Sequence, residues 1–267
     1  MNLARCLFVL MLPGLLLLAS CRTPAEAPGA AADAYQQNLD ERDAVLAALE
    51  ILKQDTLRNA FAGLARYGYT RYTRTEQRDA AQQRTAFSEH ITRIDRRNGL
   101  RTQTILQADS SGAFDTGALG GLITADPNQR DAESLPAYVL TDDPPYLAPR
   151  NRDAFLYRFL PDTSFWGAPT RVIEVRAHPT NGTGQSIRRT RFYLDRASSE
   201  LIAIYLERAE DALFFDEESR FYLHLRPSPD GGWVPYNVRF QTRLHLPLRA
   251  PRHLSTVSTY YSYDSAG

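Results

Sequence analysis

The strongest constraint on the fold is a two-residue alternation of apolar and polar side chains, which runs through most of the chain after Gly63. The clearest case lies between Val234 and Leu246, where every second residue is apolar, aromatic or Thr. This alternation is typical of an antiparallel strand with one face against a core and the other in water. The chain after Gly63 is therefore expected to be mainly β.

Eight further segments share this pattern and are separated by turn residues. They span residues 67–75, 86–95, 100–108, 171–177, 187–195, 201–208, 213–226 and 254–263. Asn98-Gly99, Asn181-Gly182 and Asp230-Gly231-Gly232 are typical of hairpin turns. Successive strands joined by short turns predict an antiparallel meander, and this many strands curl into a barrel or a strongly bent sheet.

One amphipathic helix is predicted ahead of the strands, over roughly Gln37 to Asn59. Apolar residues recur there at three- and four-residue steps among charged residues, which is the spacing of one helix face. The stripe needs an apolar partner, and everything after it is predicted to be β-structure. Its apolar positions are Leu39, Val45, Leu46, Leu49, Leu52 and Leu57.

The start of the chain follows the pattern of a bacterial lipoprotein signal peptide. Arg5 precedes an apolar run from Leu7 to Leu18, and Leu18-Ala19-Ser20-Cys21 is a lipobox-like tetrapeptide. A membrane-spanning helix is the alternative, but a run of this length reaches only about 18 Å, against a hydrocarbon core of about 30 Å. We therefore interpret residues 1–20 as a cleaved signal peptide and Cys21 as the site of lipid attachment.

Residues 22–34 are rich in Ala and Pro and lack large apolar side chains, so they cannot bury enough surface to offset chain entropy. We interpret residues 21–36 as a tether between the lipid and a single domain over residues 37–267. The acyl chains typical of such lipoproteins would keep the protein on its membrane. Because Arg22, and not Asp, follows the cysteine, the expected location is the periplasmic face of the outer membrane.

Composition excludes several classes of function. The formal net charge is zero, so nothing electrostatic recruits nucleic acid. Cys6 and Cys21 are assigned to the signal peptide and the lipid, which leaves no thiol for a disulfide, a metal site or a nucleophile. His224 and His245 lie in neighbouring predicted strands, but a metal site needs a third ligand. No catalytic motif stands out, so we expect no enzymatic activity, no cofactor and no metal.

A Gly- and Pro-rich interruption from about residue 110 to 170 breaks the run of predicted strands. A break of this length in a compact domain is usually a functional insertion or a disordered loop. If its apolar residues are exposed, they could insert into lipid or bind a partner. The alternative is that they close an open end of the barrel. These candidate contact residues are Leu119, Leu122, Phe159, Phe165 and Trp166.

Three short stretches carry a resemblance to a known group of envelope proteins. Phe192-Tyr193-Leu194-Asp195 and Leu201-Ile202-Ala203-Ile204-Tyr205 form a strand, an Asp turn and a following strand, and Gly231-Gly232-Trp233-Val234-Pro235 enters a long strand. Together with the helix and the signal peptide, they resemble the superfamily of the lipoprotein carrier LolA and receptor LolB, with the related RseB-like sensor domains. The resemblance implies an unclosed, strongly curved half-barrel whose concave side is covered by helices, leaving an apolar cavity for acyl chains.

The leading hypothesis is a membrane-tethered protein that binds lipid or lipoprotein acyl chains in an apolar trough beneath the helix. The alternative is a non-catalytic component of the envelope, with a fully packed barrel and loops that bind a protein partner. An envelope hydrolase is a third hypothesis, which would need a nucleophile and a base in one pocket. On the leading hypothesis, the ligand-binding residues are Leu46, Leu49, Leu52, Tyr236, Val238 and Phe240.

Overall fold

The computed structural model describes residues 28–51, 55–97, 100–114, 144–212, 215–246 and 249–265. The chain divides after Asn38 into two units, and all the strands belong to the second, Leu39–Gly267. Within the described residues, no helix combines the length and the apolar character needed to cross a membrane.

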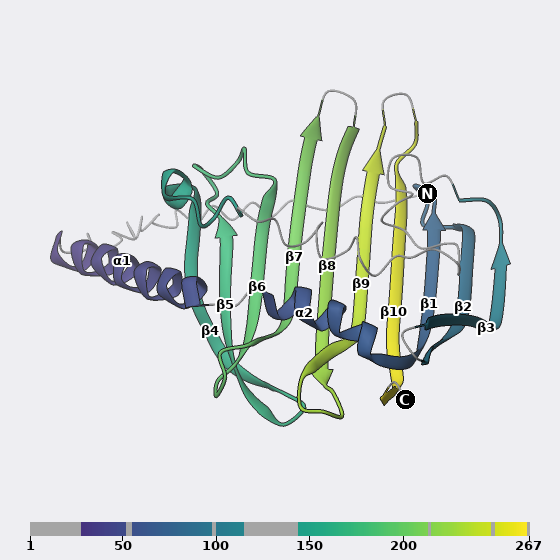
Figure 1. The fold of residues 1–267 in the computed structure, drawn as a ribbon. Coiled ribbons are helices and arrows are strands. Elements are labelled where there is room, and N and C mark those ends of the chain that lie inside the picture. Colours follow the sequence, from purple (N-terminus) through teal and green to yellow (C-terminus); the bar gives the residue numbers. More distant parts are fainter. Residues whose placement is uncertain are drawn as a thin grey trace, which may run out of the picture. The chain divides into compact units, whose positions relative to one another are not determined.

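Ten strands form one antiparallel sheet (Figure 1). They are β1 (Tyr67–Arg78), β2 (Arg84–Arg97), β3 (Leu100–Ser111), β4 (Phe155–Phe165), β5 (Ala168–Ala177), β6 (Ile187–Asp195), β7 (Leu201–Ala212), β8 (Phe215–Pro227), β9 (Trp233–His245) and β10 (Arg252–Ser265). Their order is β3-β2-β1-β10-β9-β8-β7-β6-β5-β4, so β3 and β4 are the edge strands of the described sheet, which is not closed into a barrel. The predicted fold class, a mainly β antiparallel meander, is confirmed.

The helical part begins earlier than predicted, and it consists of two helices where one was expected. Helix α1 spans Pro28–Ile51, helix α2 spans Asp55–Gly63, and a 3-10 turn, η1, follows at Leu64–Arg66. The expected start was Gln37, but α1 extends back into the segment interpreted as a tether. Proline is well accommodated in the first turn of a helix, and alanine has the highest helix propensity, so this Ala-rich segment can form a helix.

Strand β4 corrects the expectation that residues 110–170 form a loop-rich insertion. A 3-10 segment, η3 (Pro149–Ala154), leads directly into β4. Pro161 argues against a strand in the sequence, because proline cannot donate to a ladder of hydrogen bonds. Here the strand is at the edge of the sheet, and its pairing shifts between Leu160 and Thr163, where a proline is tolerated. Residues 115–143 of the predicted insertion lie outside the described residues.

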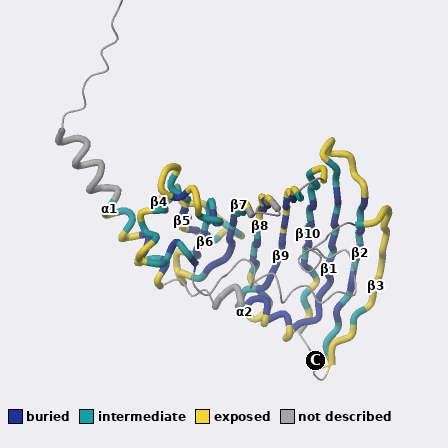
Figure 2. The backbone as a smooth tube through the Cα atoms, turned by 90° about the horizontal axis from the view of Figure 1, so that it is seen from above, coloured by how far each residue is buried: buried dark blue, intermediate teal, exposed yellow. Residues whose placement is uncertain are grey.

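The alternation of side chains gives the central strands two different faces. On one face, Phe221 pairs with Phe240 and Leu223 with Val238, and all four are buried. Helix α2 lies across this side, against β9 and β7, and we call it the helix-covered face (Figure 1). The opposite side, the polar face, carries Arg220 and its neighbours. Figure 2 shows many buried residues on the central strands, whereas edge strand β3 is exposed along most of its length.

Candidate functional site

Four of the residues predicted to bind a hydrophobic ligand lie in one buried cluster on the helix-covered face. Leu46 and Leu49 of α1 are 5% and 3% exposed, and Val238 and Phe240 of β9 are 3% and 2% exposed. Leu52 lies outside the described residues. Side chains of the helix therefore occupy the apolar side of the sheet, where the hypothesis places the ligand.

Two polar contacts join α1 to the β4 edge of the sheet. The backbone N–H of Phe159 donates a hydrogen bond to Oε1 of Glu41 over 2.9 Å. A guanidinium nitrogen of Arg42 lies 3.6 Å from a carboxylate oxygen of Asp153, whose side chain is almost fully exposed. Exposed ion pairs of this kind contribute little stability, with a typical value under about 1 kcal/mol. Most of the attachment of α1 therefore comes from apolar packing.

Tyr236 does not join the predicted ligand residues, although it follows the same alternation in the sequence. The β8–β9 register shifts between His224 and Leu225, which places one extra residue in β9 at this point. A β-bulge of this kind turns the inserted side chain away from its expected direction. The ring of Tyr236 packs instead edge-to-face against Trp166, at 4.9 Å between ring centroids, and against His224, at 5.9 Å.

The predicted membrane or partner residues are divided between the core and a hairpin tip. Phe159 is partly buried against the core cluster, and Leu119 and Leu122 lie outside the described residues. Phe165 and Trp166 lie at the β4–β5 turn, where Phe165 is half-buried against Tyr193 and His224. These contacts pack the tip of the β4–β5 hairpin against β6 and β8.

Trp166 occupies an unusual backbone conformation in that turn. Its φ is 53° and that of Gly167 is 81°, so both central residues of the two-residue loop are left-handed. The left-handed region is disfavoured for a bulky residue, which therefore needs support from its surroundings. The indole stacks on His224 at 5.3 Å between centroids, and its Nε1–H donates a 3.0 Å hydrogen bond to the carbonyl of Leu225. About half of the side chain, 51%, stays exposed.

The aromatic surroundings change the protonation of His224. Burial disfavours the imidazolium and lowers the pKa of His224 to about 4. Its Nε2 atom is shielded from solvent and forms no hydrogen bond with the described residues. His224 is therefore a neutral ring at physiological pH. It pairs with Asn237 of β9, whereas His245 pairs with Asp216, eight residues away along β8, so the two histidines do not meet across the strands.

The pKa of His224 predicts a loss of stability in mild acid. The unfolded chain takes up the His224 proton near pH 6.5, whereas the folded protein takes it up only near pH 4, so stability falls as the pH drops through this window. His224→Gln should reduce this loss. Urea unfolding at intervals between pH 7 and pH 4 measures it. An equally steep fall in the variant would show that the folded protein does not suppress this protonation.

A charged cluster lies on the polar face where β4, β5 and β6 meet. Glu174 is fully buried, and it accepts hydrogen bonds from Nε of Arg158 at 2.9 Å and from Nε of Arg191 at 2.7 Å. Burial alone raises the pKa of Glu174, but the hydrogen bonds from Arg191 and Arg158 outweigh it and hold the pKa below the ordinary carboxyl value. Glu174 is thus an ionised carboxylate with a structural role.

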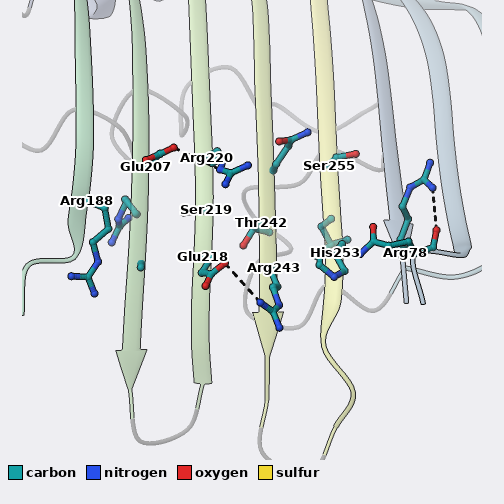
Figure 3. Close-up of a pocket in the computed structure, with 15 residues that line it drawn as sticks. Arg78, Arg188, Glu207, Glu218, Ser219, Arg220, Thr242, Arg243, His253 and Ser255 are labelled. Carbon is teal, nitrogen blue, oxygen red and sulfur yellow. Dashed lines mark hydrogen bonds and ion pairs between the residues drawn. The ribbon is translucent and has the colours of Figure 1, made fainter. Parts of the chain in front are cut away.

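Two adjoining cavities of about 660 Å³ and about 740 Å³ lie on the polar face and share Arg220 and Gln241. Figure 3 shows the first, whose charged side chains come from neighbouring strands. The pairs Arg220–Glu207 and Arg243–Glu218 are long, at 3.8 Å and 3.9 Å. The arginine side chains of these pairs are 67% and 51% exposed. They remain accessible to a ligand from solvent.

Sequence analysis did not find these cavities. The signal was present, because Arg220, Arg239 and Gln241 occupy the polar positions of two predicted strands. The alternation assigns such residues to a solvated face, and it does not say which of them lie side by side. The β8–β9 register decides that point by pairing Arg220 with Gln241 and Tyr222 with Arg239.

No protein-family model matches this sequence, and no curated protein sequence matches it. Among solved structures, similarity is found to an outer membrane lipoprotein-sorting protein domain from Vibrio parahaemolyticus. It covers 84% of this chain and 93% of that one, with 12% identity and a TM-score of 0.29. A LolA superfamily protein from Nitrosomonas europaea matches over 79% of this chain and 94% of its own, with 8% identity and a TM-score of 0.26.

A third similar structure is MucB in complex with MucA, which covers 79% of this chain and 98% of that one, with 12% identity and a TM-score of 0.19. The first two are proteins of the kind that the sequence resemblance named. At such low identities and TM-scores, the function of this chain has to be inferred from its own residues.

Proposed function

We propose that this chain is a lipid-anchored binding protein of the cell envelope that holds lipid or lipoprotein acyl chains on its helix-covered face. The proposed anchor is the lipid on Cys21, and the proposed location is the periplasmic face of the outer membrane. The observation that carries the proposal is that helices supply side chains that cover the apolar face of the sheet. In the described chain, Leu46, Leu49 and Phe61 come from two helices next to each other in sequence, and they pack into the sheet cluster.

A helical cover can leave without breaking any strand pairing. The contacts described between the helices and the sheet include apolar packing and polar contacts at the β4 edge, such as the hydrogen bond between Phe159 and Glu41. An acyl chain is as apolar as the leucines that it would replace, and burial is worth about 25 cal/mol per Å² for either. We expect that, when a ligand enters, its acyl chain replaces the helix side chains as the apolar partner of Val238 and Phe240.

Leu49→Ala should tighten the binding of acyl chains. Truncating a buried leucine removes about 2–5 kcal/mol of packing. If the cover must leave before the ligand binds, this loss raises the population of the competent state, and the apparent Kd falls at least about tenfold. The measurement is a titration of the purified, delipidated full chain with a fluorescent long-chain fatty acid. Glu50→Ala is the matched control, because this exposed neighbour on α1 should leave the Kd unchanged.

Mass spectrometry of the same preparation before delipidation reports co-purifying lipid and the acyl groups on Cys21. Lipid in the wild type, with tighter probe binding in Leu49→Ala, supports the proposal. The proposal is contradicted if neither protein binds the probe and Leu49→Ala is only less stable than the wild type.

A second candidate function is that of a packed envelope component that binds a protein partner. The observation that favours it is Trp166, which is held in a left-handed turn and is still 51% exposed. Exposed aromatic side chains on a rigid support are typical centres of protein interfaces. The failure of acyl binding described above would make this function the better supported one.

A further inference from the structure

The two cavities on the polar face form one surface that crosses the centre of the sheet. Across the strands, Glu207 of β7 pairs with Arg220 of β8, which pairs with Gln241 of β9. The next row of the same face is Tyr205, Tyr222 and Arg239. From Arg188 on β6 to Arg78 on β1 the surface crosses five strand spacings, or about 24 Å at the usual spacing of about 4.8 Å. We call this surface the arginine groove.

The arginine groove carries more positive than negative side chains. Six arginines and two glutamates line the two cavities. Arg239 donates from Nε to the side-chain oxygen of Asn237, and Arg188 donates to the carbonyls of Gly182 and Thr183. Within the described part of the chain, neither guanidinium has a carboxylate at ion-pair distance. A planar guanidinium with free donors matches a carboxylate in a bidentate arrangement.

One end of the arginine groove is lined by aromatic rings and amides. Tyr205, Tyr222, His224 and Tyr236 line the second cavity together with Asn237 and Gln241. The Nε2 atom of His224 is shielded from water and has no hydrogen-bond partner among the described residues. Flat rings accept the apolar face of a ring-shaped ligand, while amides and tyrosyl hydroxyls exchange hydrogen bonds with its hydroxyl groups.

A peptide is the other anionic ligand to consider, and the topology disfavours it. Peptides that add to a sheet pair with the unpaired backbone of an edge strand. The arginine groove crosses β6 to β10 and reaches β1, and all of these are interior strands paired on both sides. A ligand there is recognised through side chains alone. The arginine groove is longer than one sugar ring, which favours an oligomeric ligand.

We propose that the arginine groove binds an acidic oligosaccharide, with its carboxylates on Arg188 and Arg239 and a sugar ring against Tyr222 and Tyr236. This site goes beyond the proposed function, because it lies on the opposite face of the sheet from the proposed acyl site. An oligosaccharide there leaves the helical cover in place.

The test is a calorimetric titration of the full chain with a short oligogalacturonate. Arg239→Gln should weaken binding at least about tenfold, because it removes a charge-assisted hydrogen-bonding pair. Tyr236→Ala should weaken it by about 2- to 10-fold through the loss of ring stacking. Arg150→Gln is the matched control, because this exposed arginine on η3 lies outside both cavities and should leave the Kd unchanged.

Two further probes define the ligand class. A neutral galacto-oligosaccharide of equal length should bind at least about tenfold more weakly than the uronate, and a polyglutamate of equal charge should also bind more weakly. The proposal is overturned if the uronate does not bind, if either of these probes binds as tightly, or if Arg239→Gln has no effect. Arg239→Gln should keep the fatty-acid affinity of the wild type, so the failure of one site is distinguishable from the failure of the other.

Discussion

Replacing Glu174 by Gln is expected to lower the free energy of unfolding by about 3 kcal/mol, because it leaves a group of arginines without its buried counter-charge. Glu174 is fully buried and accepts from Arg158 and Arg191, while Nε of Arg189 lies 3.8 Å from it. The expected loss of about 3 kcal/mol is the low end of the range for breaking a buried ion pair. The low end applies because the side chain of Arg158 is 51% exposed and water screens part of its charge.

Urea unfolding at pH 7 measures this loss, with Glu210→Gln as the control. Glu210 lies 3.4 Å from Arg208 and its side chain is 44% exposed, so removing this charge should change the free energy of unfolding by less than about 1 kcal/mol. If the two variants lose equal stability, Glu174 does not hold the arginines of β4 and β6 together.

The same carboxylate contributes to acid unfolding. The folded protein holds the pKa of Glu174 below its ordinary value, because the hydrogen bonds from Arg191 and Arg158 outweigh the effect of burial. The resulting stabilisation is fully present above the unfolded-state pKa and is lost as the pH falls through the folded-state pKa. Glu174→Gln should lack this component, so its stability should fall less on acidification than that of the wild type.

Phe240→Ala is expected to cost about 3–5 kcal/mol, the usual range for removing a buried phenylalanine ring. Phe240 is 2% exposed and lies on β9 opposite Phe221, in the cluster that also contains Leu46 and Leu49 of α1. Thermal and urea unfolding measure the loss. Gln241→Ala is the control, because the neighbouring side chain lies on the polar face and its removal should change stability by less than about 0.5 kcal/mol.

Phe240→Ala also bears on the proposed acyl site. A ligand that binds only the folded protein adds stability as its concentration rises above its Kd. If acyl chains occupy the helix-covered face, a long-chain fatty acid should restore part of the stability that the variant loses. A variant that stays as stable as the wild type would show that Phe240 does not hold the apolar face together.

Much of the fold follows from local patterns. The alternation in β9 and the leucine spacing of α1 are properties of neighbouring residues, and they correctly predict that four side chains are buried: Val238, Phe240, Leu46 and Leu49. Strand β4 was missed for a reason that is also physical. Pro161 argues against an interior strand and is compatible with an edge strand, and whether a strand lies at an edge depends on the whole sheet.

The candidate sites needed the tertiary structure. A single extra residue in β9, next to Pro235, moves Tyr236 away from Val238 and onto Trp166 and His224. The arginine groove likewise exists because strand pairing brings together residues far apart in the chain. By itself, the sequence determined the meander, the presence of helix ahead of it and the apolar positions of both, because periodicity is local. Only the tertiary structure decided which side chains meet, because register and bulges are set by packing across the whole sheet.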